Sequence, residues 1–112
     1  MKTVAYTPGR PHILITYPSS LEPSPSSPLR VISFVGSHMD VVPADPSTWI
    51  RDPFTFVREG DLLFGRGTTD CLGHVALLTE LFIQLAQKKP ALGLTVFGVM
   101  IVDEVKYTWI CL

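Results

Sequence analysis

The chain contains little cysteine and almost no net charge. Among 112 residues only two are cysteines, Cys71 and Cys111, which is too few for a disulfide-stabilised framework. The formal net charge is −1, so composition offers no electrostatic basis for binding nucleic acid or an anionic membrane. No apolar run reaches the length of a membrane-spanning helix. Disulfide-rich scaffolds and strongly basic nucleic-acid binders are therefore excluded.

Targeting signals are also missing from the first residues. The segment 1–9 has neither the apolar stretch of a secretory signal nor the Arg-rich character of a transit peptide. We therefore expect a cytoplasmic protein in which Cys71 is a small packing residue. A reactive thiol at a helix start is the alternative, which the negative charge of the neighbouring Asp70 disfavours.

Hydrophobic residues make up 46% of the chain, which is enough for one domain with a modest core. β-Branched and aromatic runs predict strands at residues 12–17, 30–36 and 92–102. The second run is nearly continuously apolar, which predicts a strand covered on both faces of a parallel or mixed sheet. Proline and serine dominate residues 18–30, which predicts a solvated loop; a proline-rich recognition peptide is the alternative.

A hairpin and a helix are predicted in the second half. Residues 54–57 and 61–64 flank a glycine-containing turn, which indicates a β-hairpin. Apolar residues at helical spacing predict a helix over 72–88, capped by residues 68–70 and ended by Pro90. The order strand, strand, hairpin, helix, strand predicts an α/β domain with a mixed sheet.

Ionisable side chains follow the ends of these predicted elements. His38 and Asp40 follow one buried strand, Asp103 and Glu104 follow another, and Asp70 opens the helix. Binding sites of α/β sheets form where loops leave the carboxyl ends of strands. We therefore expect these side chains to meet at one rim of the sheet.

The residue types suit a hydrolytic zinc site, which needs imidazole and carboxylate ligands and a position for water. His38 can supply a nitrogen, and Asp40 can hydrogen-bond the other ring nitrogen. Asp70 is a candidate bridge between two metals, and Glu104 is a candidate general base. Each residue alone has an ordinary explanation: a hydrogen-bonded turn, a helix cap or a solvated strand end.

Several other residues near these motifs have two interpretations each. His74 lies one helical turn after Asp70 and could donate to the site or lie on the helix face without such a role. Arg66 could pair with a carboxylate or face solvent. Trp49 and Phe54 are expected to pack in the core or against loops.

Three segments in combination resemble a known family: GSHMDVVPA at 36–44, GDLLFGRGTTDCLGHVALLTELF at 60–82 and VMIVDEV at 99–105. They are similar to the zinc aminoacyl-hydrolase and metallopeptidase family that includes acetylornithine deacetylase, succinyl-diaminopimelate desuccinylase, aminoacylase and carboxypeptidase G-type enzymes. The stretch 65–76 looks most like the eukaryotic acetylornithine deacetylase-like members.

The resemblance implies a role for each matching residue. His38 would be a metal ligand, Asp40 would orient it, and Asp70 would bridge two divalent ions, zinc or alternatively cobalt. The peptide after Asp70 would be cis. Glu104 would be the catalytic base, whereas Val105 stands where the family has a carboxylate ligand and cannot bind metal.

The implied enzyme is a metal-dependent amidohydrolase that cleaves the N-acetyl amide of N-acetylornithine, a step of arginine biosynthesis, or of a similar N-acyl amino acid. It would act on a small molecule as a homodimer. We expect residues 1–112 to be the N-terminal part of its catalytic domain, with a divergent end at 103–112 and without the lid or dimerisation domain. The alternatives are a catalytically inactive product with at most a binding role, and a fragment of a related dipeptidase or desuccinylase.

Overall fold

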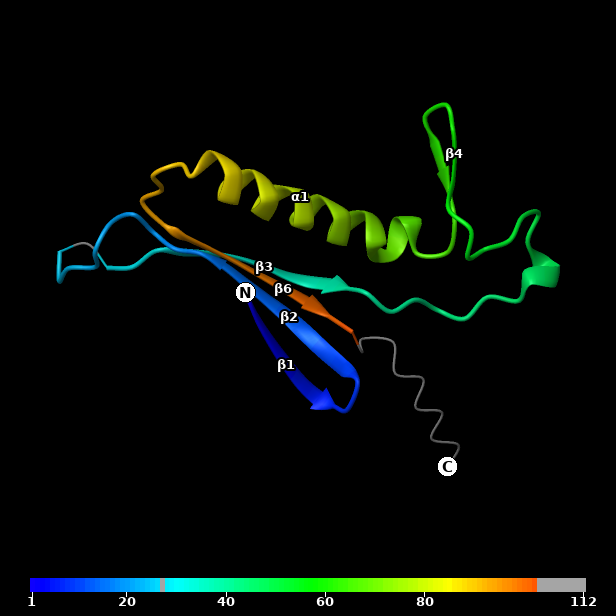
Figure 1. The fold of residues 1–112 in the computed structure, drawn as a ribbon, viewed down its shortest axis with the longest axis horizontal. Coiled ribbons are helices and arrows are strands. Elements are labelled where there is room, and N and C mark those ends of the chain that lie inside the picture. Colours follow the sequence, from blue (N-terminus) through cyan, green and yellow to red (C-terminus); the bar gives the residue numbers. More distant parts are fainter. Residues whose placement is uncertain (27, 103–112) are drawn as a thin grey trace.

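A computed structural model describes residues 1–26 and 28–102 of the chain. Glu104 and the other residues of 103–112 lie outside this part. The elements in chain order are β1 (Lys2–Thr7), β2 (Arg10–Tyr17), β3 (Val31–His38), the 3₁₀ turn η1 (Pro46–Thr48), β4 (Val57–Glu59), β5 (Leu62–Phe64), the π-type turn η2 (Thr68–Leu72), α1 (Gly73–Lys88) and β6 (Thr95–Ile101) (Figure 1).

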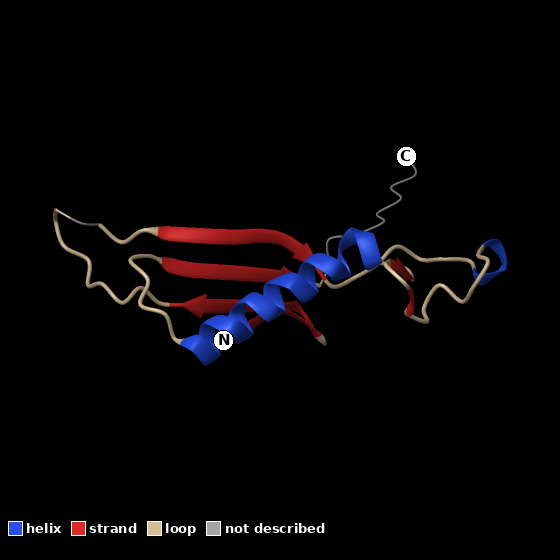
Figure 2. Ribbon diagram, turned by 90° about the horizontal axis from the view of Figure 1, so that it is seen from above, coloured by secondary structure: helices blue, strands red, loops and turns tan. Residues whose placement is uncertain are grey.

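A four-stranded sheet forms the body of the molecule, in the order β1-β2-β6-β3. β3 and β6 are parallel, whereas β6 with β2 and β2 with β1 are antiparallel. The parallel pair needs a long crossover, which α1 provides by lying across one face of the sheet (Figure 2). The predicted α/β organisation with a mixed sheet is therefore confirmed.

The core lies between α1 and β6. Leu78 and Phe82 are the buried side chains of α1, and burial alternates along β6 as expected for a strand with one covered face. Gly98 lets the two elements approach closely, because a Cβ built there would lie 2.6 Å from Cε2 of Phe82. The absence of a side chain at this position therefore helps to set the distance between helix and sheet.

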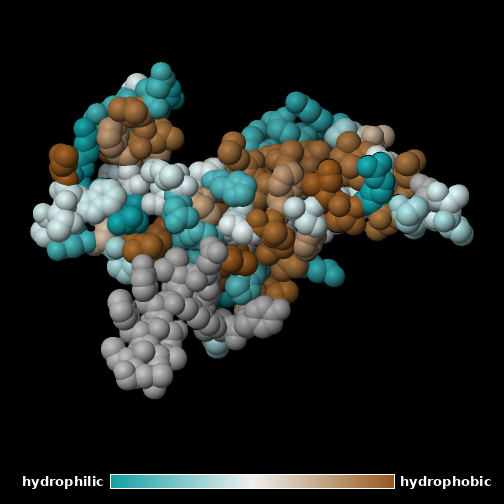
Figure 3. Space-filling view, turned by 180° about the vertical axis from the view of Figure 1, so that it is seen from behind, coloured by the Kyte–Doolittle hydropathy of each residue, from teal (hydrophilic) through white to brown (hydrophobic). Residues whose placement is uncertain are grey.

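β3 is not covered on both faces, so that prediction is wrong. Val31, Ile32 and Val35 are 51%, 47% and 65% exposed. The strand is at the edge of the sheet, and the described helix lies over one face only. Apolar side chains consequently contribute much of the surface, both on the sheet and on the β4–β5 hairpin (Figure 3).

Several strand boundaries in the sheet differ from the sequence-based expectation, and one strand was missed. β3 extends two residues beyond Gly36, so His38 is its last residue rather than part of the following loop. β1 was not predicted; it pairs with β2 through a tight turn in which Gly9 adopts φ +76°. β2 begins two residues earlier than expected, and β6 begins at Thr95 because residues 93–94 form a bend. Residues 18–26 and 28–30 contain neither a helix nor an extended strand, as expected for the proline- and serine-rich loop.

The hairpin is present, but its first strand is misplaced in the prediction. The carboxylate of Asp52 accepts hydrogen bonds from the amide of Phe54 (3.0 Å) and the hydroxyl of Thr55 (2.7 Å). This side-chain turn competes with strand pairing, so β4 starts only at Val57. Phe54 is 61% exposed and therefore does not pack in the core.

α1 matches the predicted helix closely, except at its start. Its end is marked by Lys89 in the left-handed conformation (φ 47°), directly before Pro90. Residues 68–70 do not cap it by side-chain hydrogen bonds but belong to the separate turn η2. Within residues 1–26 and 28–102, no helix is both long and apolar enough to cross a membrane.

Candidate metal centre

A β-bulge in β3 prepares the first side chain of the site. Phe34 is paired with Gly98 and Ser37 with Met100, so three steps along β3 match two along β6. Gly36 accommodates the extra residue with φ +88°. Beyond the bulge, Ser37 is fully buried and the neighbouring His38 is 5% exposed. The carboxyl end of β3 is therefore the best-buried part of that strand.

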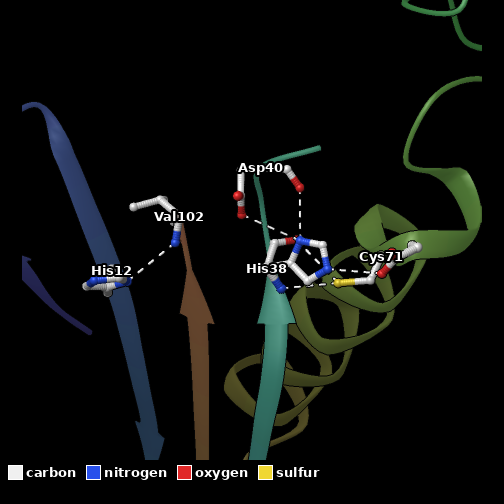
Figure 4. Close-up of polar contacts among 6 residues, drawn as sticks. His12, His38, Asp40, Cys71 and Val102 are labelled. Carbon is white, nitrogen blue, oxygen red and sulfur yellow. Dashed lines mark hydrogen bonds and ion pairs between the residues drawn. The ribbon is translucent and has the colours of Figure 1, made fainter. Parts of the chain in front are cut away.

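The ring of His38 is oriented by Asp40, two residues further on (Figure 4). Nδ1 of His38 lies 2.9 Å from the backbone carbonyl oxygen of Asp40 and 3.5 Å from its carboxylate oxygen Oδ1. The carbonyl can only accept, so Nδ1 carries a proton, and Nε2 is the ring nitrogen that remains to face Asp70. The expected contact with Asp40 is thus formed, with the main-chain oxygen closer than the side chain.

Asp70 reaches the same ring from η2. Its Oδ1 lies 3.0 Å from Nε2 of His38, although 32 positions separate the two residues. Asp70 has extended backbone angles (φ −126°, ψ 96°), and the peptide to Cys71 is cis, as the resemblance implied. η2 thereby turns a carboxylate towards β3.

Two glycines allow the chain to fold this tightly around Asp70. Gly67 has φ +86°, and a Cβ there would lie 2.6 Å from Cγ1 of Val41, in the segment that follows His38. A Cβ at Gly73 would lie 2.7 Å from the carbonyl oxygen of Thr68. Gly67 therefore allows close approach to the segment after His38, and Gly73 allows η2 to close tightly against the start of α1.

The paired atoms suit a cation. With Nδ1 protonated, both Nε2 of His38 and Oδ1 of Asp70 offer lone pairs to the space they share, so a proton or a metal ion has to lie there. The side chain of His38 is 6% exposed and that of Asp70 is 78% exposed, which leaves the carboxylate accessible from solvent. Together with Sγ of Cys71, these ligand atoms lie within 4.8 Å of one another. The described residues thus fit a divalent metal through one imidazole and one carboxylate.

The remaining sequence-predicted residues divide into those near this pair and those outside the described part. Glu104, Asp103 and Val105 fall in residues 103–112, so the proposed base and the missing ligand stay predictions. His12 accepts a hydrogen bond from the amide of Val102 (3.3 Å) across the sheet (Figure 4).

His74 lies against β3 rather than free on the helix face. Its Nδ1 is 3.3 Å from the hydroxyl of Ser37, the fully buried residue before His38. Sequence reasoning missed Ser37. The available signal was Gly36 inside an otherwise apolar strand, which often marks a bulge near a site.

Arg66 lies over the ring of Trp49, with Cζ 4.9 Å from the ring centroid. Within residues 1–26 and 28–102 Arg66 forms no ion pair with a carboxylate, so the carboxylate pairing considered from the sequence is not found there. Both residues border a cavity of about 310 Å³ that is lined by residues 63–70 together with Val42 and Trp49. Since Asp70 is one of the lining residues, the cavity opens directly beside the candidate metal ligands.

Comparisons with known proteins indicate the family of the chain. The sequence model of Peptidase family M20/M25/M40 matches residues 34–104, which include His38, Asp40 and Asp70. A protein named acetylornithine deacetylase from Dictyostelium discoideum is 62% identical over 97 residues, covering 87% of this chain and 21% of the relative. An Arabidopsis thaliana protein of the same name is 54% identical over 101 residues, covering 90% and 22%.

A succinyl-diaminopimelate desuccinylase from Methylobacterium sp. (strain 4-46) is 39% identical over 72 residues, covering 62% of this chain and 18% of that protein. The chain thus spans about a fifth of the length of the curated relatives that it matches.

Proposed function

The chain belongs to Peptidase family M20/M25/M40, and from this premise we propose that it is part of the catalytic domain of a metal-dependent amidohydrolase. The proposed substrate is N-acetylornithine or a similar N-acyl amino acid, which hydrolysis converts to a free amine and a carboxylate. The names of the relatives with 62% and 54% identity support this substrate class.

The convergence of His38 and Asp70 carries the proposal. Nε2 and Oδ1 lie 3.0 Å apart, come from segments distant in sequence, and are matched in kind to zinc. We propose that the complete site would hold two divalent ions, zinc or alternatively cobalt, with His38 and Asp70 among the residues that bind them. When bound, such ions supply Lewis acidity and a water molecule that ionises near neutral pH.

In this proposal, Asp40, Glu104 and the cavity beside Asp70 each have a separate role. Asp40 keeps the Nδ1 proton of His38 in place, so that Nε2 stays a ligand. Glu104 would accept the proton of the attacking water and deliver it to the leaving amine. The cavity beside Asp70 would receive the substrate, since about 310 Å³ falls at the small end of ligand pockets.

The surface supports placing the chain within a larger catalytic domain. The radius of gyration is 18.2 Å, whereas a compact domain of this length has about 13 Å. Large apolar side chains such as Ile50, Phe56 and Leu77 are more than 60% exposed. We propose that further parts of a homodimeric enzyme, including a lid domain, cover this surface.

Zinc titration of the purified chain tests the proposed site. Asp70→Asn removes the negative ligand and should weaken zinc affinity by about 100-fold or more, since loss of supporting contacts alone costs about 10–100-fold. Asp61→Asn is the matched control, because Asp61 is an exposed carboxylate in the hairpin. Equal affinities of the two variants would refute the site.

A hydrolysis assay separates the candidate functions. Release of ornithine from N-acetylornithine supports the deacetylase, whereas preference for N-succinyl-diaminopimelate supports the desuccinylase that the third relative suggests. Zinc binding without hydrolysis of either compound would support the binding role that Val105, with its apolar side chain, leaves open.

A further inference from the structure

We propose that Ser37, Cys71 and His74 are positioning residues that hold Asp70 against His38. We call these three residues the clasp. They connect the same two segments that supply the candidate ligands: Ser37 precedes His38 on β3, while Cys71 and His74 follow Asp70 on η2 and α1. The inference rests on the proposed metal site and assigns these three residues a supporting role in it.

Cys71 forms two hydrogen bonds with the main chain of His38. Its Sγ accepts a hydrogen bond from the amide of His38 (3.1 Å) and donates one to the carbonyl oxygen of the same residue (3.4 Å). On its other edge β3 pairs with β6, where His38 is opposite Ile101. The thiol therefore pairs with the amide and the carbonyl group of His38 at the outer edge of β3, as the backbone of a neighbouring strand would. Because Asp70 directly precedes Cys71, these two hydrogen bonds hold the carboxylate of Asp70 beside the imidazole of His38.

The same contacts argue against Cys71 as a metal ligand. A cysteine binds metal as a thiolate, which has lost its proton. The thiolate could no longer donate to the carbonyl oxygen of His38, and its charge would lie 3.4 Å from that oxygen. The side chain is 9% exposed and has both its donor and its acceptor engaged by the backbone. Its proximity to the ligands thus reflects support rather than coordination.

Ser37 and His74 form the second connection; Ser37 is one residue before His38, and His74 is four residues after Asp70. The hydroxyl of Ser37 has no exposed surface and lies 3.3 Å from Nδ1 of His74 in the first turn of α1. A buried hydroxyl without a partner is costly, so this contact favours one placement of α1 relative to β3. Ser37 faces α1 because the bulge pairs it with Met100, whose side chain is buried below the helix.

Zinc affinity measured in a set of variants tests the clasp. Cys71→Ser keeps a donor and an acceptor and should retain most of the affinity, whereas Cys71→Ala and His74→Ala should each weaken it about tenfold. His74 is exposed, so its removal should lower stability through the unpaired hydroxyl of Ser37 without preventing folding. Thr79→Ala is the control, because Thr79 is an exposed residue of α1 whose hydroxyl donates a hydrogen bond to the carbonyl oxygen of Val75 in the same helix (2.8 Å). Equal affinity in all variants would overturn the clasp.

Cobalt absorption decides between support and coordination. In a Cys111→Ser background, the cobalt-loaded chain should lack the intense near-ultraviolet band of a cobalt–thiolate bond. Such a band, lost in Cys71→Ser, would identify Cys71 as a ligand and overturn its assignment.

Hydrogen exchange supplies a readout without metal. The amide of His38 should exchange faster in Cys71→Ala than in Cys71→Ser, because only the alanine variant removes its acceptor. Equal exchange rates of the His38 amide in both variants would refute the hydrogen bond between Cys71 and β3. Failure of the unsubstituted chain to bind zinc would instead refute the proposed site, so the two failures are distinguishable.

Discussion

Replacing Gly98 by alanine should destabilise the chain, although alanine normally suits a strand better than glycine. The intrinsic preference favours alanine in a strand interior by roughly 0.5–1 kcal/mol. At this position, however, the new Cβ would lie 2.6 Å from Cε2 and 3.1 Å from Cζ of Phe82. Carbon atoms in good contact are about 3.5–4.0 Å apart, so the overlap is close to 1 Å.

Relief of this overlap requires either the ring or the whole helix to move. Phe82 is one of the two buried side chains of α1, and overpacking of such a site costs about 1–3 kcal/mol. The clash therefore outweighs the gain in propensity, and we expect a net loss of about 1–2 kcal/mol in the free energy of unfolding, measured by urea denaturation.

Two further variants make this reasoning refutable. Gly93→Ala is the matched control, since the nearest atom to its Cβ is Cδ1 of Leu21 at 3.4 Å, an ordinary contact, and its stability should be almost unchanged. Phe82→Leu combined with Gly98→Ala should recover stability relative to the sum of the single changes, because the shorter side chain makes room. A Gly98→Ala chain as stable as the parent, or an additive double variant, would contradict the packing described.

Three other changes have defined outcomes. Arg51 donates to both carboxylate oxygens of Glu59, which holds the pKa of Glu59 below its ordinary value; Arg51→Gln should raise the midpoint of its NMR titration. This exposed pair contributes a small amount to the free energy of unfolding. The contribution is fully present above the ordinary pKa of a glutamate and is lost as the pH falls through the lowered pKa of Glu59. Tyr17→Phe removes a 2.8 Å hydrogen bond to the carbonyl of Pro90 and should cost about 0.5–1.5 kcal/mol in urea unfolding. Gly67→Ala adds a methyl group 2.6 Å from a valine side chain at φ +86°, and thermal unfolding should show a loss of about 1–3 kcal/mol.

Elements that carry their own periodic signal could be predicted from the sequence. α1 has a repeating apolar face that ends at Pro90, and β6 is a long β-branched run, so neither depends on distant contacts for recognition. β1 is short and only half of its residues are apolar (KTVAYT), so without its pairing to β2 it was not recognised as a strand.

Errors arose where a side chain competes with regular structure or where exposure depends on neighbours. Asp52 bonds the amide of Phe54 and delays β4, although residues 54–57 have strand-like composition. Residues 68–70 have cap-like composition, but the helix cannot start there because Asp70 and Cys71 leave helical backbone angles. The apolar character of β3 predicted cover on both faces, yet the strand lies at the edge of the sheet.

The position of the candidate site was predictable because it follows from topology. Parallel β3 and β6 end at the same edge, and Asp70 belongs to the crossover between them, so His38 and Asp70 were expected to meet. The supporting contacts were not predictable in the same way. They depend on the direction of one thiol and one hydroxyl, which the residue types alone do not specify.

The backbone conformation of Gly36 determines to which face of the sheet the following side chains of β3 point. Its φ of +88° accommodates the extra residue of the bulge. Ser37 therefore contacts His74 of α1, and the imidazole of His38 contacts the carboxylate of Asp70. A residue that favours an extended conformation at this point would let the strand slip by one position, which exchanges the two faces. Ser37 would then point where His38 now points, with every ligand-type residue still present in the chain. The chemistry of this segment is thus encoded partly in a torsion angle, which no inventory of functional groups would reveal.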